Sequence, residues 1–223
     1  FNNWKLRKTL INELLNNIEF DILCAQEFTS KMKVNDFSKL CDYQIIPTFN
    51  VPIFIRKGIE ICETYENTDT LTRLIKNSPE KHGKRFNAVS LDVDGKGLLL
   101  VNCHLHHLYF GKNDAQRALE IYAINDFVNS LELHENLPVI ICGDFNCRPN
   151  TLPIKIMKEK GFVDIHDGLI TNESYNGYGT HSGDKIDYVF AKNADSVETK
   201  IISKQIRGMY PSDHNPIYTT LNI

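Results

Sequence analysis

The sequence predicts an α/β protein, namely a four-layer α-β-β-α sandwich of two mostly antiparallel sheets with helices on the outside. Short apolar runs bounded by Gly, Pro or polar residues recur along the chain, which is typical of strands. Two longer segments carry apolar residues at helical spacing, and an Asp-Gly pair between two alternating runs indicates a hairpin. Because 223 residues is within the range of one domain, we expect a single domain over residues 1–223.

The first half of the chain is expected to begin with a helix. Between residues 4 and 18 apolar side chains recur at helical spacing, behind a candidate N-cap at Asn2 or Asn3. Strands are expected over residues 21–25, 43–47 and 53–56, whereas the Asn-, Thr- and Glu-rich residues 63–77 are expected to be irregular.

The second half contains the hairpin and the longest helix. The hairpin arms are residues 85–92 and 98–103, joined through Asp94-Gly95. The helix is expected over residues 114–133, capped by Asn113 or Asp114. Its inward face would consist of Leu119, Tyr122, Ala123, Phe127 and Leu131. A buried strand at 139–142, a basic helix over 151–160 that ends at Gly161, and strands at 186–190 and 217–221 complete the prediction.

Composition and charge limit the classes of partner. The formal net charge of −3 argues against a protein whose whole surface binds duplex nucleic acid, so a nucleic-acid partner would need a local basic patch. No apolar run approaches the ~20 residues of a membrane-spanning helix. The six cysteines form no Cys-x-x-Cys pair, and three lie in apolar runs. We therefore expect reduced thiols and a cytoplasmic location, although the chain opens at Phe1 and not at Met.

Polar side chains follow or interrupt several of the predicted strands. Taken singly, each has an ordinary structural explanation, such as an Asx turn or a solvated strand end. Together they could line one rim of a sandwich, and a carboxylate inside an apolar strand, as at Asp187, needs a partner. The set consists of Glu27, His104, Asp144, Asn146, Asp187, Asp213 and His214.

Carboxylates beside histidines, without a cysteine, match a hard cation such as Mg²⁺ that also binds water and phosphate oxygens. The residues alone therefore indicate phosphoester hydrolysis. A zinc site built on His104, His106 and His107 is disfavoured, because no other Cys or His spacing completes it. Arg117, in the first turn of the long helix, could form a surface ion pair or anchor a phosphate. The Gly-rich residues 175–183 could enclose a ligand.

Five motifs, in order, resemble the endonuclease/exonuclease/phosphatase (DNase I-like) superfamily over nearly the whole chain. They are Gln26-Glu27, Asn102-Cys103-His104-Leu105, Gly143-Asp144-Phe145-Asn146, Ile186-Asp187-Tyr188 and Ser212-Asp213-His214-Asn215-Pro216. Three further segments look like its uncharacterised, largely bacterial branch: Asn3-Trp4-x-x-Arg7-Lys8, Tyr175-Asn176-Gly177-Tyr178 and Gly208-Met209-Tyr210-Pro211. By this resemblance, the first strand of the family, with an Asn near the metal, would precede Phe1.

The resemblance implies a role for each site residue. Glu27 would bind Mg²⁺, with Mn²⁺ as a possible substitute, and Asp213 would support the metal. Asp144 would orient or deprotonate the attacking water, and His214, held by Asp187, would act as general base or transition-state donor. His104 would donate to a phosphate oxygen and Asn146 would hold the scissile phosphate. Candidate substrate-binding residues are Arg117, His107, Tyr178 and Asn215.

These roles describe a Mg²⁺-dependent phosphodiesterase or nuclease acting on nucleic acid or a nucleotide. Two alternatives stay open: a phosphatase or phospholipase-type hydrolase of a small phosphorylated molecule, and a catalytically silent binding module. Nothing in the sequence indicates an oligomeric state.

Overall fold

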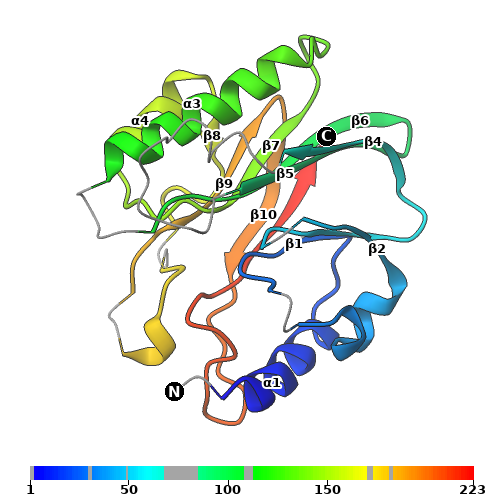
Figure 1. The fold of residues 1–223 in the computed structure, drawn as a ribbon, viewed down its shortest axis with the longest axis vertical. Coiled ribbons are helices and arrows are strands. Elements are labelled where there is room, and N and C mark those ends of the chain that lie inside the picture. Colours follow the sequence, from blue (N-terminus) through cyan, green and yellow to red (C-terminus); the bar gives the residue numbers. More distant parts are fainter. Residues whose placement is uncertain are drawn as a thin grey trace.

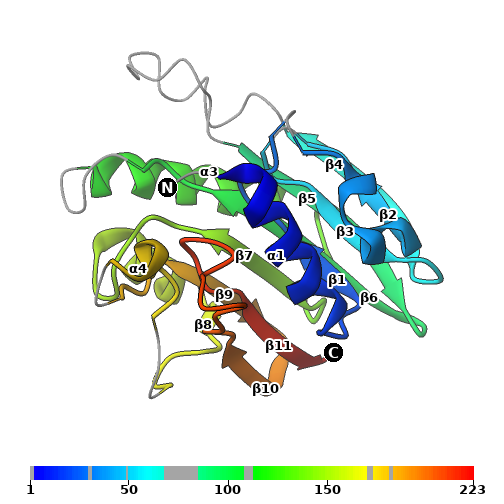
Figure 2. The same cartoon turned by 90° about the horizontal axis from the view of Figure 1, so that it is seen from below.

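A computed structural model describes residues 3–29, 32–48, 50–67, 85–107, 113–169, 173–180 and 183–223. The elements form four layers, as the sequence predicted (Figure 1). Helices α3 and α4 cover one face of a six-stranded sheet. Two smaller sheets pack on its other face, and α1 lies outside them (Figure 2).

The six-stranded sheet has the strand order β4-β5-β6-β7-β9-β8. The predicted hairpin is its centre, and the Asp94-Gly95 turn has φ values of 54° and 83°, as a tight hairpin turn requires. Strand β7 pairs with β6 in parallel, and α3 forms the crossover between them, whereas the other neighbours are antiparallel. The strands are β4 (Glu60–Asn67), β5 (Arg85–Val93), β6 (Lys96–His104), β7 (Val139–Asp144), β8 (Val163–Asp164) and β9 (Asp187–Lys192).

One face of this sheet buries its apolar side chains under α3 (Asp114–Ser130) and α4 (Leu152–Glu159). Strand β7 is buried along its whole length, in agreement with the expected core strand. The core on this side includes Ile141 and Phe190 from the sheet with Ile121 from α3 and Met157 from α4, all fully buried.

The opposite face packs against the sheet β1-β3-β2 and the pair β10-β11. In β3, Ile53 and Ile55 point into this core, whereas Phe54 points to the outer layer, where Trp4 and Ile11 of α1 cover it. The elements of this half are α1 (Trp4–Asn16), β1 (Ile22–Cys24), β2 (Tyr43–Ile46), β3 (Ile53–Arg56), β10 (Asp195–Ile201) and β11 (Ile217–Asn222).

Two sequence predictions are corrected by the structure. Residues 60–67 form the edge strand β4, although residues from 63 onward were expected to be irregular; residues 68–77 lie outside the described residues. The strand is mostly exposed and so lacks an apolar pattern. The expected inward face of α3 was partly wrong, because Leu119 and Tyr122 are 53% and 43% exposed.

Candidate active site

Three of the predicted site residues lie in one row across the large sheet. In the parallel pairing of β6 with β7, His104 is opposite Asp144, and in the antiparallel pairing of β7 with β9, Asp144 is opposite Asp187. Strand register therefore places three polar side chains from distant parts of the chain at neighbouring positions. The Nε2 atom of His104 lies 3.4 Å from Oδ2 of Asp144.

Gly143 makes this row possible. Its φ is +136°, and a Cβ atom there would lie 1.9 Å from the carbonyl oxygen of Cys103. Only glycine allows strands β6 and β7 to approach this closely with Asp144 in its observed position. The glycine of the Gly-Asp-x-Asn motif is thus required by backbone packing.

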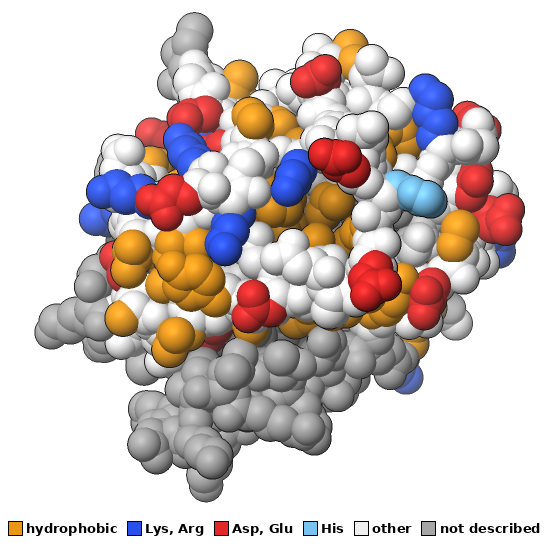
Figure 3. All heavy atoms as spheres, turned by 90° about the horizontal axis from the view of Figure 1, so that it is seen from above, with side chains coloured by type: hydrophobic (Ala, Val, Ile, Leu, Met, Phe, Trp, Pro, Cys, Tyr) orange, Lys and Arg blue, Asp and Glu red, His pale blue; other side chains and the backbone are white. Residues whose placement is uncertain are grey.

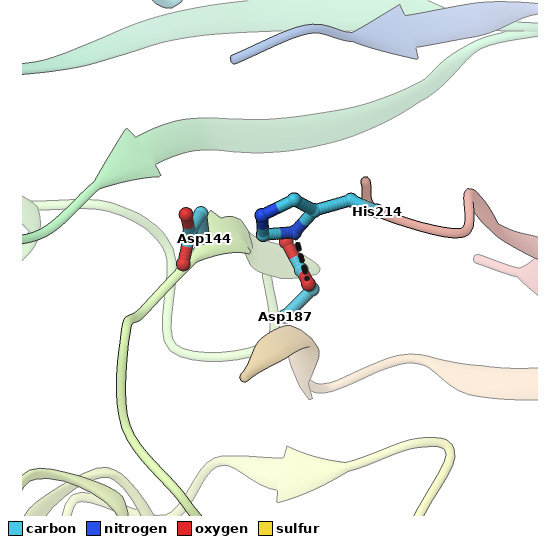
Figure 4. Close-up of side chains that lie close together, drawn as sticks. All are labelled: Asp144, Asp187 and His214. Atoms are coloured by element: carbon cyan, nitrogen blue, oxygen red, sulfur yellow. Dashed lines mark hydrogen bonds and ion pairs between the residues drawn. The ribbon is translucent and has the colours of Figure 1, made fainter. Parts of the chain in front are cut away.

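His214 reaches the row from the loop before β11. Its Nδ1 is 2.8 Å from Oδ2 of Asp187, and ligand atoms of Asp144, Asp187 and His214 all lie within 4.8 Å of one another. Figure 4 shows the three side chains converging, with the His214–Asp187 bond as a dashed line. This is the partner that the carboxylate inside an apolar strand requires.

The surroundings of His214 favour its charged form. Burial lowers the pKa of the imidazole, but the charge and hydrogen bond of Asp187, together with the charges of Asp144 and Asp213, outweigh it and raise the pKa to about 10. The imidazole is therefore protonated at neutral pH and donates from Nδ1 to Asp187. The second nitrogen then also carries a proton.

Asn146 is tied to the same row. Its backbone N–H donates to Oδ1 of Asp144 at 2.8 Å, and its side-chain amide donates to the carbonyl of Leu105 at 3.1 Å. Asn146 has a positive φ of 50°, which Asn tolerates better than most residues. The turn after β7 therefore fixes the orientation of the Asp144 carboxylate.

Glu27 and Asp213 lie outside the close cluster of Asp144, Asp187 and His214. Glu27 follows β1, is exposed, and has an unusual positive φ of 57°. Its neighbour Gln26 donates to Oδ1 of the fully buried Asn102 at 2.7 Å, which fixes this turn to β6. Burial raises the pKa of Tyr178 to about 12, and the negative charges of Asp213 and Glu27 add to this shift, so the three residues share one neighbourhood.

The donor set suits a hard cation better than zinc. The close cluster offers two carboxylates and one imidazole, and Asp187 is already engaged by His214. Glu27 and Asp213, whose charges both act on Tyr178, offer further carboxylate oxygens, and Mg²⁺ is commonly held by one or two carboxylates with water and phosphate oxygens. The residues present therefore fit the ion that the sequence implied.

Arg117 is placed in the interior and not on the surface. It is 1% exposed, and its guanidinium donates to the carbonyl of His106 at 2.9 Å and pairs with Asp114 at 2.7 Å. The carboxylate of Glu120 accepts from the N–H of His106 at 2.9 Å. Helix α3 thus binds both the N–H and the carbonyl of His106, two residues after His104. The next residue, His107, is exposed.

A cavity of about 320 Å³ adjoins this region. It lies between the start of α3 and the loop from β7 to α4, and Asn146 forms part of its wall. Arg148, another lining residue, makes two hydrogen bonds to Asp184, at 2.8 and 3.0 Å. The other lining residues are Asp114, Arg117, Cys147, Pro149 and Thr151.

The sequence analysis assigned no site role to three residues that hold the site together, although Arg7 and Asn176 stand in two of the segments that resemble the bacterial branch. Arg7 of α1 donates to the carbonyl of Pro211 at 3.1 Å and lies 5.0 Å from the ring centre of Tyr178. Ser174 and Asn176 bind the backbone around Asp187 and His214. Their sequence signal is weak, because short polar residues are common in any loop. The expected substrate-binding residue Asn215 takes part in the same network and is 6% exposed.

The family model described as "Endonuclease/Exonuclease/phosphatase family" matches residues 1–214. The chain belongs to this family.

Three proteins of this family that resemble the chain carry names that indicate different activities or ligands. Human sphingomyelin phosphodiesterase 2 is 24% identical over an alignment of 258 positions, which covers 96% of this chain and 59% of that protein. The chain thus spans less than two thirds of that relative. The mannosyl-6-phosphatase Bt3783 of Bacteroides thetaiotaomicron is 20% identical, with a TM-score of 0.83 over 99% of this chain and 92% of its own. TDP2 of D. rerio, solved with a single-strand DNA product, is 17% identical, with a TM-score of 0.76 over 97% of this chain and 92% of its own.

Proposed function

We propose that this endonuclease/exonuclease/phosphatase family member is a metal-dependent phosphoester hydrolase whose reaction takes place at Asp144 and His214. The observation that carries the proposal is the convergence of Asp144, Asp187 and His214, whose ligand atoms lie within 4.8 Å of one another. The names of its relatives record both phosphodiesterase and phosphatase activity, which supports the same class of reaction.

The roles follow from the chemistry of each group. Asp144, fixed by the N–H of Asn146, accepts the proton of the attacking water, and the water oxygen bonds to phosphorus as the bond to the leaving oxygen breaks. His214, whose Nδ1 is held by Asp187 at 2.8 Å, is the candidate donor to the phosphate through its other ring nitrogen. With Asp144 proposed as the acceptor of the water proton, His214 takes the donor role. His104 and the Asn146 side chain are the other candidate phosphate contacts.

Glu27 and Asp213 would hold Mg²⁺, with Mn²⁺ as a substitute. When bound, the cation stabilises negative charge on phosphate oxygens. Both charges act on Tyr178, which supports a shared site for the two carboxylates.

The first candidate substrate is a phosphodiester in nucleic acid or a nucleotide. A second candidate, a small phosphomonoester, is favoured by the cavity beside Asn146, whose volume of about 320 Å³ is at the small end of ligand sites. The lining includes the carboxylate of Asp114, the amide of Asn146 and the hydroxyl of Thr151, polar groups of the kind that sugar hydroxyls bind. The mannosyl-6-phosphatase neighbour supports this alternative.

A substrate panel tests the proposal. Phosphodiesters and phosphomonoesters are assayed with Mg²⁺ and with a chelator, and we expect turnover that the chelator abolishes. A salt titration then separates the candidates, because a polyanionic substrate loses affinity steeply with salt and a sugar phosphate much less. Turnover that is indifferent to the chelator, or Mg²⁺ binding without any turnover, would overturn the proposal and favour a binding module.

Two broader properties are part of the proposal. We place the activity in one domain over residues 1–223, and in a reducing, cytoplasmic compartment, which is supported by the six free cysteines. Within the described part of the chain, no helix has the length and apolar character to cross a bilayer.

A further inference from the structure

We propose that residues 173–178, here called the clamp segment, set the geometry of the Asp187–His214 pair, with Ser174 and Asn176 as positioning residues. The inference rests on the proposed function, because it assigns the pair a role in catalysis. The clamp segment lies between β8 and β9 in the chain, so it is separate from both partners of the pair.

Ser174 forms hydrogen bonds with the backbone of Asp187 and with the backbone next to His214. Its fully buried hydroxyl oxygen accepts from the N–H of Asp187 at 2.9 Å and from the N–H of Ile186 at 3.0 Å. Its carbonyl accepts from the N–H of Asn215, next to His214, at 2.6 Å. One residue therefore fixes the start of β9 relative to the loop that carries His214.

Asn176 fixes that loop on both sides of His214. Its side-chain amide donates to Oδ1 of Asn215 at 2.8 Å and to the carbonyl of Ser212 at 3.3 Å. Its backbone N–H donates to the carbonyl of Asp213 at 2.7 Å. Asn176 and Asn215 are both 6% exposed, so these bonds are formed away from bulk water.

Two more contacts complete the clamp. The side-chain amide of Asn215 donates to the carbonyl of Glu173 at 3.0 Å. The ring of Tyr175 packs edge-on against the imidazole of His214, with the ring centres 5.1 Å apart. Successive residues of one short segment thus contact the backbone beside Asp187, the backbone beside His214, and the His214 ring itself.

This arrangement matters because Asp187 and His214 come from segments that are not paired as strands. The row of His104, Asp144 and Asp187 is fixed by sheet register, whereas His214 lies on a loop and has a side chain that is 30% exposed. A displacement of about 1 Å in a reacting group can cost on the order of 100-fold in rate. The clamp segment supplies the rigidity that the sheet does not extend to His214.

The test compares Asn176→Ala with Asn125→Ala. Asn125 is a matched control, because it is a buried Asn (4% exposed) whose amide donates to a backbone carbonyl, that of Ile121, in α3 and away from the pair. Steady-state kinetics on the best substrate of the panel are combined with NMR of the His214 Nδ1 proton, assigned through its loss in His214→Gln.

We expect Asn176→Ala to lower kcat about 10- to 100-fold with little change in KM, and to shift or broaden the Nδ1 proton signal. Asn125→Ala should lower the melting temperature without either effect. Ser174→Ala should act like Asn176→Ala, and Ser174→Thr, which keeps the hydroxyl, should restore part of the loss. The Asn176 variant keeps the test decisive if Ser174→Ala does not fold.

An Asn176→Ala protein with the kcat and the Nδ1 signal of the wild type would overturn the inference, as would equal effects in Asn125→Ala. Failure of the proposed function is distinguishable. If the wild type turns over no phosphoester, the NMR signal still shows whether the clamp segment holds the pair.

Discussion

At the scale of single residues, the site depends on a few positions where only one residue type fits. Gly143 is such a position, because any side chain would collide with the carbonyl of Cys103. Asp187 is another, because its carboxylate interrupts an apolar strand and is balanced by His214. Both were visible in the sequence as exceptions, a glycine that ends a strand and a charge within one. Ser174 was not visible, and Asn176 stood out only within a segment that resembles the bacterial branch, because nothing in a polar loop distinguishes a buried hydroxyl or amide from an exposed one.

His166 provides a pH-dependent prediction at this scale. The ring is fully buried beside Tyr188, and burial lowers the pKa of His166 to about 4 despite the nearby charge of Asp164. The unfolded chain binds a proton near pH 6.5 and the folded chain only near pH 4. Stability from this group is therefore present above pH 6.5 and is lost as the pH falls from 6.5 to 4, by about 3 kcal/mol at most.

Urea unfolding of the wild type and His166→Gln at pH 7 and pH 4.5 measures this contribution. The variant should lose less stability between the two pH values than the wild type does. His134→Gln, at an exposed histidine, is the control and should follow the wild type. Parallel pH dependence of the wild type and His166→Gln would refute the assignment.

At the scale of elements, apolar patterns were a good guide to buried segments and a poor one to exposed segments. The core strand β7 and the hairpin of β5 and β6 are where the sequence predicts them. Strands β8 and β10 had no prediction, and β4 was expected to be irregular. These strands lack a clear apolar pattern: most of β10, for example, is exposed, and Val197 is 72% exposed. These segments are strands because they pair with a neighbouring strand and not because they are buried. A single sequence does not show which segments pair.

In helix α3 the apolar pattern also failed to identify the buried face. Its buried face includes Arg117 and Glu120, which bind the backbone of His106, so polar residues occupy positions where apolar ones were expected. Leu119 and Tyr122 are exposed instead. A helix whose inner face serves a functional loop does not follow a simple apolar stripe.

Helix α1 contributes to the site through Arg7, which contacts Pro211 and Tyr178. Replacing Arg7 with Ala removes a hydrogen bond and a cation–π contact, so we expect a loss of about 1–2 kcal/mol in the free energy of unfolding. Arg207→Ala is the control, because its ion pair with Glu13 is exposed and should contribute less than about 1 kcal/mol. Urea unfolding measures both, and equal losses would show that Arg7 is an ordinary surface residue.

At the scale of the whole molecule, the sandwich brings residues from the two halves of the chain together at one rim. Of the seven residues predicted as one site, Asp144, Asp187 and His214 form the close cluster, His104 and Asn146 contact Asp144, and the charges of Asp213 and Glu27 act on Tyr178. The charge distribution is mixed. On the face shown in Figure 3, Lys and Arg side chains lie among Asp and Glu side chains, with hydrophobic side chains between them. The net charge of −3 argues against a substrate bound by the surface as a whole.

The most direct measurement of the central claim is kcat for Asp144→Ala, His214→Ala and the double variant, on the best substrate of the panel with Mg²⁺ present. If the two residues act in one site, each single variant should lose at least ~100-fold, and the double variant should lose far less than the product of the two losses. Single variants within a few-fold of the wild type, or losses that simply multiply in the double variant, would contradict the account.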